Sequence, residues 1–96
     1  MNSAPGLLAR GMKLSHLQMM VAFAETSQIG AAAQALGIAQ PAASRLLSEI
    51  EAILGQPVRA RAGRGVVLTQ AGRTLADRAA RVMQELAEAG REMAEI

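Results

Sequence analysis

Residues 29–55 read IGAAAQALGIAQPAASRLLSEIEAILG, and this stretch decides the fold. A short helix is predicted over residues 29–36, because the apolar residues recur at helical spacing. Gly37 suits the left-handed cap that ends such a helix. A second helix is predicted from Gln40 to Leu54, since Pro41 has no N–H to lose in a first turn and a glycine follows the last apolar residue.

The second of these helices carries different chemistry on its two faces. At about 100° per residue, polar and small side chains share one arc and apolar side chains share the opposite arc. The first arc can therefore remain exposed while the second arc packs against the rest of the domain. Two helices joined by a tight turn, with one face of the second left free, are typical of a helix-turn-helix that reads DNA. The free arc holds Gln40, Pro41, Ser44, Arg45 and Ser48, and the apolar arc holds Ala43, Leu46, Leu47, Ile50, Ile53 and Leu54.

The free arc has the donors and acceptors that base recognition needs. Arg45 can donate two hydrogen bonds to guanine O6 and N7, and Gln40 can pair with adenine or another base edge. Pro41 offers an apolar contact, and Ser44 can bond a phosphate or a base. A lone arginine would be interpreted as a solvated surface residue, but the whole set beside a tight turn favours DNA contact.

A small hairpin is predicted after the second helix. The segments 58–61 and 66–68 are short and rich in β-branched residues or arginine, and glycines lie between them. A hairpin that follows a helix-turn-helix is called a wing. The tip of this wing carries Arg61 and Arg64. Arg64 can reach into a minor groove, where negative potential is concentrated. An ordinary solvated turn is the alternative interpretation of this tip.

Further helices are predicted on both sides of this region. The first runs from Ser15, as N-cap, to about Thr26. His16 near its start is interpreted as a hydrogen-bonded surface or boundary residue and not as a ligand. The inward residues of this helix are predicted to be Leu17, Met20, Val21 and Ala24.

The last helix is predicted to begin after Thr69 as N-cap, with Gly72 and Gly90 as weak points. Its apolar residues recur at alternating spacings of four and three, as in a heptad repeat. Such a stripe favours pairing with a second helix, so we expect a homodimer, whose helix direction the spacing leaves open. The stripe consists of Leu75, Ala79, Val82, Leu86, Ala89, Met93 and Ile96. Other methionines, Met19, Met20 and Met83, are interpreted as fillers of the core or of this stripe.

Composition limits the remaining possibilities. The chain has 96 residues, no cysteine and one histidine, which excludes disulfides and argues against a metal site or a bound cofactor. An enzyme is not expected, since no nucleophile–base pair or carboxylate pair is visible. No apolar run approaches the roughly 20 residues that cross a bilayer. Residues 1–13 are too weakly apolar for a secretory signal and are interpreted as a loose arm, which favours the cytoplasm.

These residues resemble the N-terminal DNA-binding domain of LysR-type transcriptional regulators over about residues 14–72. The resemblance implies a mainly α fold, a winged helix-turn-helix with a two-stranded β wing, followed by a linker helix that pairs in a dimer. It also implies that Gln40, Pro41, Ser44 and Arg45 face the major groove and that Arg64 lies near the minor groove. It rests on Leu17, Phe23, Glu25, Ala32, Ala33, Leu36, Gln40, Pro41, Ala42, Ser44, Arg45, Glu51, Leu54, Gly55, Arg61, Arg64, Leu68, Thr69, Ala71 and Gly72.

The resemblance divides the chain into an arm (1–13), the winged domain (14–68) and the linker helix (69–96). Full-length members usually form tetramers and carry an effector domain of two α/β lobes that binds a small-molecule inducer. We expect this effector domain to be absent here, so that the chain is a truncated DNA-binding half. Three positions depart from the family pattern: Arg59 stands where a buried phenylalanine or leucine is usual, Gly30 where threonine or serine is common, and Gln28 where serine is typical.

The expected function is that of a sequence-specific domain of a bacterial regulator that binds double-stranded DNA. As a dimer it would recognise an inverted repeat. The alternative is a helical protein-interaction module that dimerises through its last helix and binds no DNA. Salt separates the two, because DNA affinity falls steeply with ionic strength and apolar docking does not.

Overall fold

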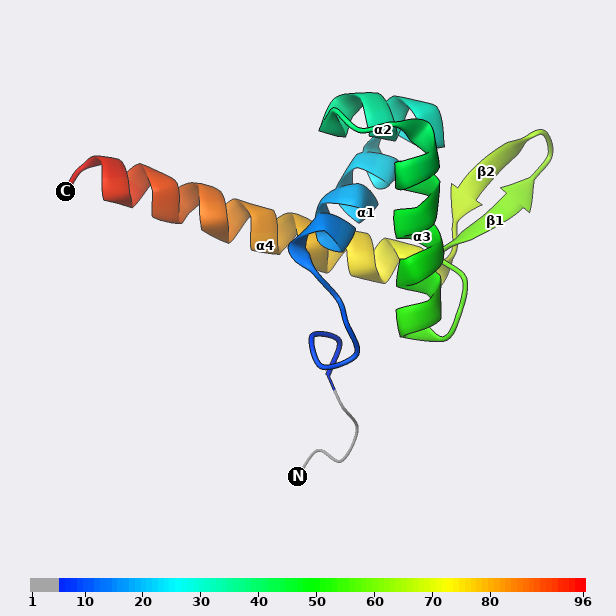
Figure 1. The fold of residues 1–96 in the computed structure, drawn as a ribbon, viewed down its shortest axis with the longest axis horizontal. Helices are drawn as coiled ribbons and strands as arrows, with labels where there is room; N and C mark the ends of the chain where they lie inside the picture. The colour runs from blue at the N-terminus through cyan, green and yellow to red at the C-terminus, as the bar shows by residue number, and fades with distance from the viewer. Residues whose placement is uncertain (1–5) are drawn as a thin grey trace.

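The computed structural model describes residues 6–96, and Figure 1 shows their arrangement. The chain is mainly helical with one two-stranded antiparallel sheet, which confirms the predicted winged helix-turn-helix. The elements in chain order are α1 (Leu14–Thr26), α2 (Ile29–Leu36), α3 (Gln40–Leu54), β1 (Arg59–Ala62), β2 (Gly65–Leu68) and α4 (Gln70–Ala94).

The core forms around α1, which packs against α2, α3 and α4. Burial of its apolar side chains is the main stabilising contribution in a domain of this size. Because α1 packs against three helices, its buried side chains cover more of its circumference than the single apolar stripe that the spacing predicts. The predicted inward residues Leu17, Val21 and Ala24 are accordingly only half-buried. The largest fully buried side chains are Phe23, Met19, Met20, Leu47, Ile50 and Val58.

The start of α1 differs from the prediction. The helix begins at Leu14, with Lys13 and not Ser15 as the N-cap residue. The backbone N–H of Lys13 donates to Nδ1 of His16 at 2.9 Å, so the histidine at the third helical position accepts the N-cap N–H, as a glutamate or glutamine does in a capping box. The end of the helix at Thr26 agrees with the prediction.

The turn between α2 and α3 has the conformation that its glycine predicts. Gly37 caps α2 with φ of 70°, and the N–H of Ile38 donates to the carbonyl of Ala33 at 3.0 Å. Helix α3 then begins at Gln40, with Pro41 in its first turn, and ends at Leu54. Both bounds of α3 agree with the prediction.

The hairpin is formed by β1 and β2, with Arg59 paired to Leu68 and Ala62 to Gly65. Gly63 at the tip has φ of 59°, a conformation that glycine adopts without strain. Strand β1 is shifted by one residue from its predicted bounds of 58–61, and β2 begins one residue earlier than predicted and ends at Leu68 as predicted. Val58 is fully buried before β1 begins, and so it joins the core instead of the sheet.

Helix α4 leaves the body, as Figure 1 shows. Its first part packs on α1, and Leu75 and Ala79 are only 7% and 1% exposed within this single chain. Little of these two predicted interface residues is therefore left for a second chain to cover. Heptad spacing marks an apolar stripe but does not tell whether α1 or a second chain covers it. The stripe is exposed only further along, at Val82, Leu86, Ala89, Met93 and Ile96.

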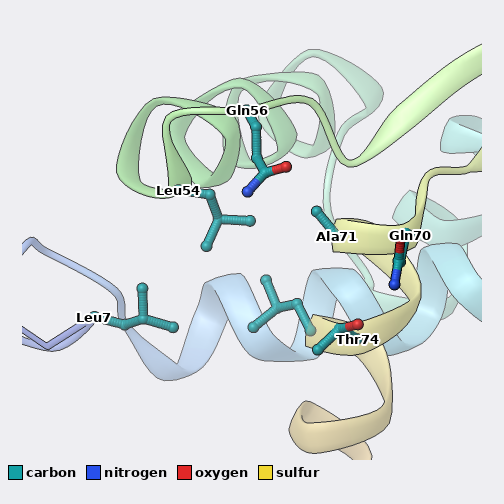
Figure 2. A pocket seen from close by; sticks show the side chains of 7 residues that line it. Leu7, Leu54, Gln56, Gln70, Ala71 and Thr74 are labelled. Atoms are coloured by element: carbon teal, nitrogen blue, oxygen red, sulfur yellow. The ribbon is translucent and has the colours of Figure 1, made fainter.

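The described part of the N-terminal arm is not loose. Met12 is 4% exposed, and Leu7 packs against the edge of the core. Leu7 also lines a shallow hollow of about 390 Å³ between α3 and α4, shown in Figure 2. Residues 1–5 of the predicted arm lie outside the described residues. Over residues 6–96, no helix has the length and apolar character needed to cross a membrane.

Candidate nucleic-acid interface

Helix α3 separates its two faces as the sequence predicts. Ala43, Leu47 and Ile50 are fully buried. On the other face, Ser44 is half-buried and the other predicted contact residues are exposed, so this face is accessible along most of the helix. The exposed residues are Gln40, Pro41, Arg45 and Ser48.

The amino-terminal end of α3 favours negative charge. Its N-cap residue, Ala39, has no side-chain oxygen to satisfy the first N–H groups, so these groups carry the positive end of the helix dipole. Arg45, six residues after Ala39, is exposed. An anionic phosphate and a base edge are the groups that such an end accommodates.

The wing adds two exposed arginines. Arg61 lies on β1, and Arg64 lies in the tip between Gly63 and Gly65. In Figure 1 the wing projects beside α3, while α4 extends in the opposite direction. The predicted contact residues of α3 and of the wing are therefore exposed, except for the half-buried Ser44.

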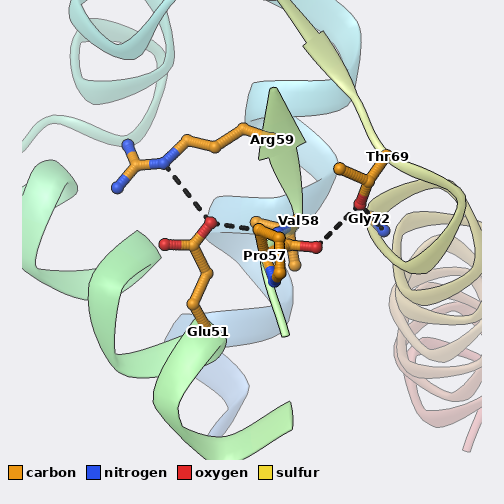
Figure 3. A network of polar contacts seen from close by, with 6 residues as sticks. All are labelled: Glu51, Pro57, Val58, Arg59, Thr69 and Gly72. Carbon is orange, nitrogen blue, oxygen red and sulfur yellow. Dashed lines mark hydrogen bonds and ion pairs between the residues drawn. The ribbon is translucent and has the colours of Figure 1, made fainter. Parts of the chain in front are cut away.

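A polar network fixes the wing to α3, as Figure 3 shows. Oε2 of Glu51 accepts the backbone N–H of Val58 at 3.0 Å. The same oxygen lies 3.5 Å from Nε of Arg59. Arg59 and Glu51 are each 24% exposed, so the pair is partly shielded from solvent. Arg59 thereby ties β1 to α3 by charge, at the position where the family pattern has an apolar side chain.

The segment before β1 is fixed to the start of α4. The hydroxyl of Thr69 donates to the carbonyl of Pro57 at 2.8 Å and accepts the N–H of Gly72 at 3.1 Å. Thr69 is thus the predicted N-cap of α4. A Cβ on Gly72 would lie only 2.2 Å from the carbonyl oxygen of Val58. Glycine is therefore required at residue 72, where the backbone of α4 lies close to the backbone of Val58. This corrects the prediction of Gly72 as a weak point of the helix.

His16 is buried, which corrects its prediction as a surface or boundary residue. It is 3% exposed, and its Nε2 lies 2.8 Å from Oε1 of Glu49 on α3. Because Nδ1 accepts the Lys13 N–H, the proton lies on Nε2, and Nε2 donates to Glu49. The neutral ring satisfies both partners at once and joins the start of α1 to α3.

Glu49 lies next to the exposed face of α3. The hydrogen bond from His16 is the main cause that holds the pKa of the Glu49 carboxyl below its ordinary value. Desolvation opposes it, and the nearby charges of Arg45 and Lys13 lower the pKa by smaller amounts. Glu49 is consequently a carboxylate at neutral pH, four residues from Arg45. Its negative charge restricts the approach of phosphate to that side of α3.

Sequence reasoning missed the Glu51–Arg59 pair, the role of Gly72 and the burial of His16. Each involves atoms from two elements that are distant in the chain. The available signals were the charge of Arg59 at an apolar position of the family pattern and the spacing of three residues between Lys13 and His16. In residues 6–96, no group of three or more metal-binding side chains is present.

Comparison with known proteins identifies the family. A family model described as "Bacterial regulatory helix-turn-helix protein, lysR family" matches residues 14–73, more than half of the chain. The transcriptional regulator GbpR of Rhizobium radiobacter is 52% identical over 82 residues, which are 83% of this chain and 27% of that protein. The uncharacterized regulator YdcI of Escherichia coli is 34% identical over 87 residues. The chain spans about a quarter of the length of these relatives.

Solved structures agree with this assignment. A crystal structure of the BenM DNA-binding domain with catB site 1 DNA has a TM-score of 0.81 at 30% identity, and covers 88% of this chain and 94% of that chain. The CbnR DNA-binding domain in a DNA complex has a TM-score of 0.76 at 31% identity, with 88% and 97% covered. Both structures share the arrangement of helices described above. The chain belongs to the lysR family of bacterial regulatory helix-turn-helix proteins, a family of transcriptional regulators and not of enzymes.

Proposed function

We propose that this chain is a sequence-specific DNA-binding domain of a bacterial transcriptional regulator. One observation carries the proposal: α3 keeps Gln40, Arg45 and Ser48 exposed while the opposite face packs into the core through the fully buried Ala43, Leu47 and Ile50. The related domains of BenM and CbnR were solved as complexes with DNA, which supports the same role for this face.

In this proposal α3 lies in the major groove and the wing contacts the adjacent minor groove. Arg45 reads guanine through two hydrogen bonds, and Gln40 reads a neighbouring base edge. Pro41, Ser44 and Ser48 supply apolar and phosphate contacts. Arg61 and Arg64 bring positive charge to the backbone and to the minor groove.

The proposed assembly is a homodimer formed through the exposed part of the α4 stripe. A two-fold dimer presents two copies of α3, so its site is an inverted repeat. The parent regulator would act in the cytoplasm, form tetramers and bind a small-molecule inducer in an effector domain outside this chain. The domain itself would catalyse no reaction and need no cofactor.

Selection of bound duplexes from a random DNA pool tests the proposal. Recovery of a recurring inverted repeat is the expected result, and recovery of unrelated sequences would contradict sequence-specific binding. Affinity for the selected duplex is then measured at rising salt. A protein with about six phosphate contacts loses on the order of a thousandfold in affinity between about 50 and 200 mM salt. A salt-independent affinity would favour apolar docking instead.

A further inference from the structure

Gly30, in the first turn of α2, has space beside it that the Gln40 side chain occupies. A Cβ built at Gly30 would lie 3.1 Å from Oε1 and 3.8 Å from Cδ of Gln40. The backbone of Gly30 is in the ordinary helical region and not at positive φ. The glycine is therefore explained by the approach of Gln40 and not by backbone conformation.

In the structure the amide of Gln40 lies with its oxygen towards Gly30. Its oxygen and its carbonyl carbon lie within 4 Å of the site of the absent Cβ, whereas its nitrogen lies farther away. The amino-terminal end of α2 has no side-chain cap, and its partial positive charge favours the oxygen at this side. The NH2 group of Gln40 is consequently the part that is left for a ligand.

We propose that Gly30 is a specificity-determining residue of the α3 recognition face, acting by setting the position of the Gln40 amide. The proposal rests on the DNA-binding function proposed above and deepens it. A presented NH2 group is a donor, so it selects a base with a major-groove acceptor: N7 of a purine, O6 of guanine or O4 of thymine. Recognition of adenine by two hydrogen bonds requires both a donor and an acceptor on the glutamine. With its oxygen turned towards Gly30, the Gln40 amide does not present this acceptor to the base.

A side chain at residue 30 would change this recognition without disturbing the fold. A contact of 3.1 Å is tighter than an ordinary van der Waals contact, so the Gln40 amide must shift away from a methyl group at residue 30. The amide is the far end of an exposed, flexible side chain and moves easily. Alanine also has a higher helix propensity than glycine, so the substitution does not weaken α2.

The test compares base preferences of the wild-type chain with those of Gly30→Ala, Gln40→Ala and the double variant. Each is used to select duplexes from the same random pool, and affinities for the recovered sites and their single-base variants are measured. At the base pair whose preference Gln40→Ala abolishes, Gly30→Ala is expected to change the preference by about fivefold or more. In the Gln40→Ala background, Gly30→Ala is expected to have no further effect.

Two more variants make the result specific. Gly90→Ala adds a methyl group to a helical glycine with open space around it, so its base preferences should equal those of the wild type. Gln40→Glu leaves residue 30 unchanged but replaces the donor NH2 by an acceptor oxygen. It is expected to lose the preference for an acceptor base by about fivefold or more.

The possible failures are distinguishable. If the wild type selects a site and Gly30→Ala keeps every base preference, the role of Gly30 is disproved while DNA binding stands. A Gln40→Glu variant that keeps the wild-type preference disproves the donor role of Gln40, whatever the behaviour of Gly30→Ala. A wild type that selects no sequence disproves the proposed function and this inference with it.

Discussion

Glu51 and Arg59 join the recognition helix to the wing, with Oε2 of Glu51 lying 3.5 Å from Nε of Arg59. The same oxygen accepts the N–H of Val58 at 3.0 Å, so one carboxylate fixes both the backbone and the side chain at the base of β1. The two bonds differ in how much they contribute to the stability of the fold. The N–H of a buried residue has no solvent to replace a lost acceptor, whereas the guanidinium of Arg59 is partly solvated.

Glu51→Ala is therefore expected to destabilise the fold more than Arg59→Ala. Leaving a buried N–H unsatisfied costs about 1–3 kcal/mol. A partly exposed ion pair contributes about 0–1 kcal/mol once solvent screening is considered. Urea denaturation of both variants measures the difference. Equal losses would mean that the ion pair, and not the bond to Val58, is the main contribution of Glu51.

Gly72 and Gly90 form a matched pair on α4. Gly72→Ala is expected to lower the free energy of unfolding by at least about 1–3 kcal/mol, because the new methyl group would overlap the carbonyl oxygen of Val58. Gly90→Ala meets nothing and is expected to raise helix stability by up to about 1 kcal/mol. Denaturation curves of the two variants compare the effects directly. A harmless Gly72→Ala would disprove the close approach.

The bond between His16 and Glu49 predicts a loss of stability in acid. Because the pKa of Glu49 is lowered in the folded chain, its contribution is fully present above the unfolded value near 4.5 and is lost as the pH falls through the folded pKa. Glu49→Gln removes this contribution. The variant is expected to lose less stability than the wild type between about pH 5 and pH 3.

Denaturation midpoints at several pH values measure this difference. Glu92→Gln, which removes one carboxylate from the exposed part of α4, controls for the change in net charge. Parallel pH curves of Glu49→Gln and the wild type would show that the bond to His16 does not stabilise the fold.

The parts of the fold that follow from local chemistry were predictable from the sequence. Gly37 and Pro41 restrict their own backbones, so they mark the turn and the start of α3 wherever the helix packs. The hairpin likewise follows from glycines between two short segments. The exposed face of α3 was predictable because a helix has a fixed angle per residue.

The remaining features depend on partners that sequence spacing does not identify. His16 is buried because Glu49, 33 residues away, provides an acceptor. Gly72 is required by the carbonyl of Val58, and Gln40 is positioned by the absence of a side chain at Gly30. Leu75 has the heptad spacing of a residue at a dimer interface, but α1 of its own chain covers it. Such pairings become visible only in the folded chain.

Arg45→Ala is expected to reduce discrimination at one base pair of each half-site by about 1–3 kcal/mol, the usual contribution of two hydrogen bonds to guanine. Competition between the selected duplex and single-base variants measures this. Arg91→Ala is the control, because it removes an exposed arginine from the far part of α4. Full discrimination in Arg45→Ala would exclude a base-reading role for this residue.

The exposed part of the α4 stripe predicts where the homodimer can be broken. Leu86 is 53% exposed in the single chain, so burial of the rest of its side chain against a second chain would contribute about 1 kcal/mol per copy, roughly half of the value for full burial. Leu86→Glu is therefore expected to raise the dimer dissociation constant by roughly tenfold or more, since a carboxylate in an apolar interface adds a desolvation cost. Ala87→Glu places the same charge one residue away, outside the stripe, and should leave the dissociation constant nearly unchanged. Sedimentation equilibrium of both variants provides the comparison, and an unchanged dimer in Leu86→Glu would place the interface elsewhere on the chain.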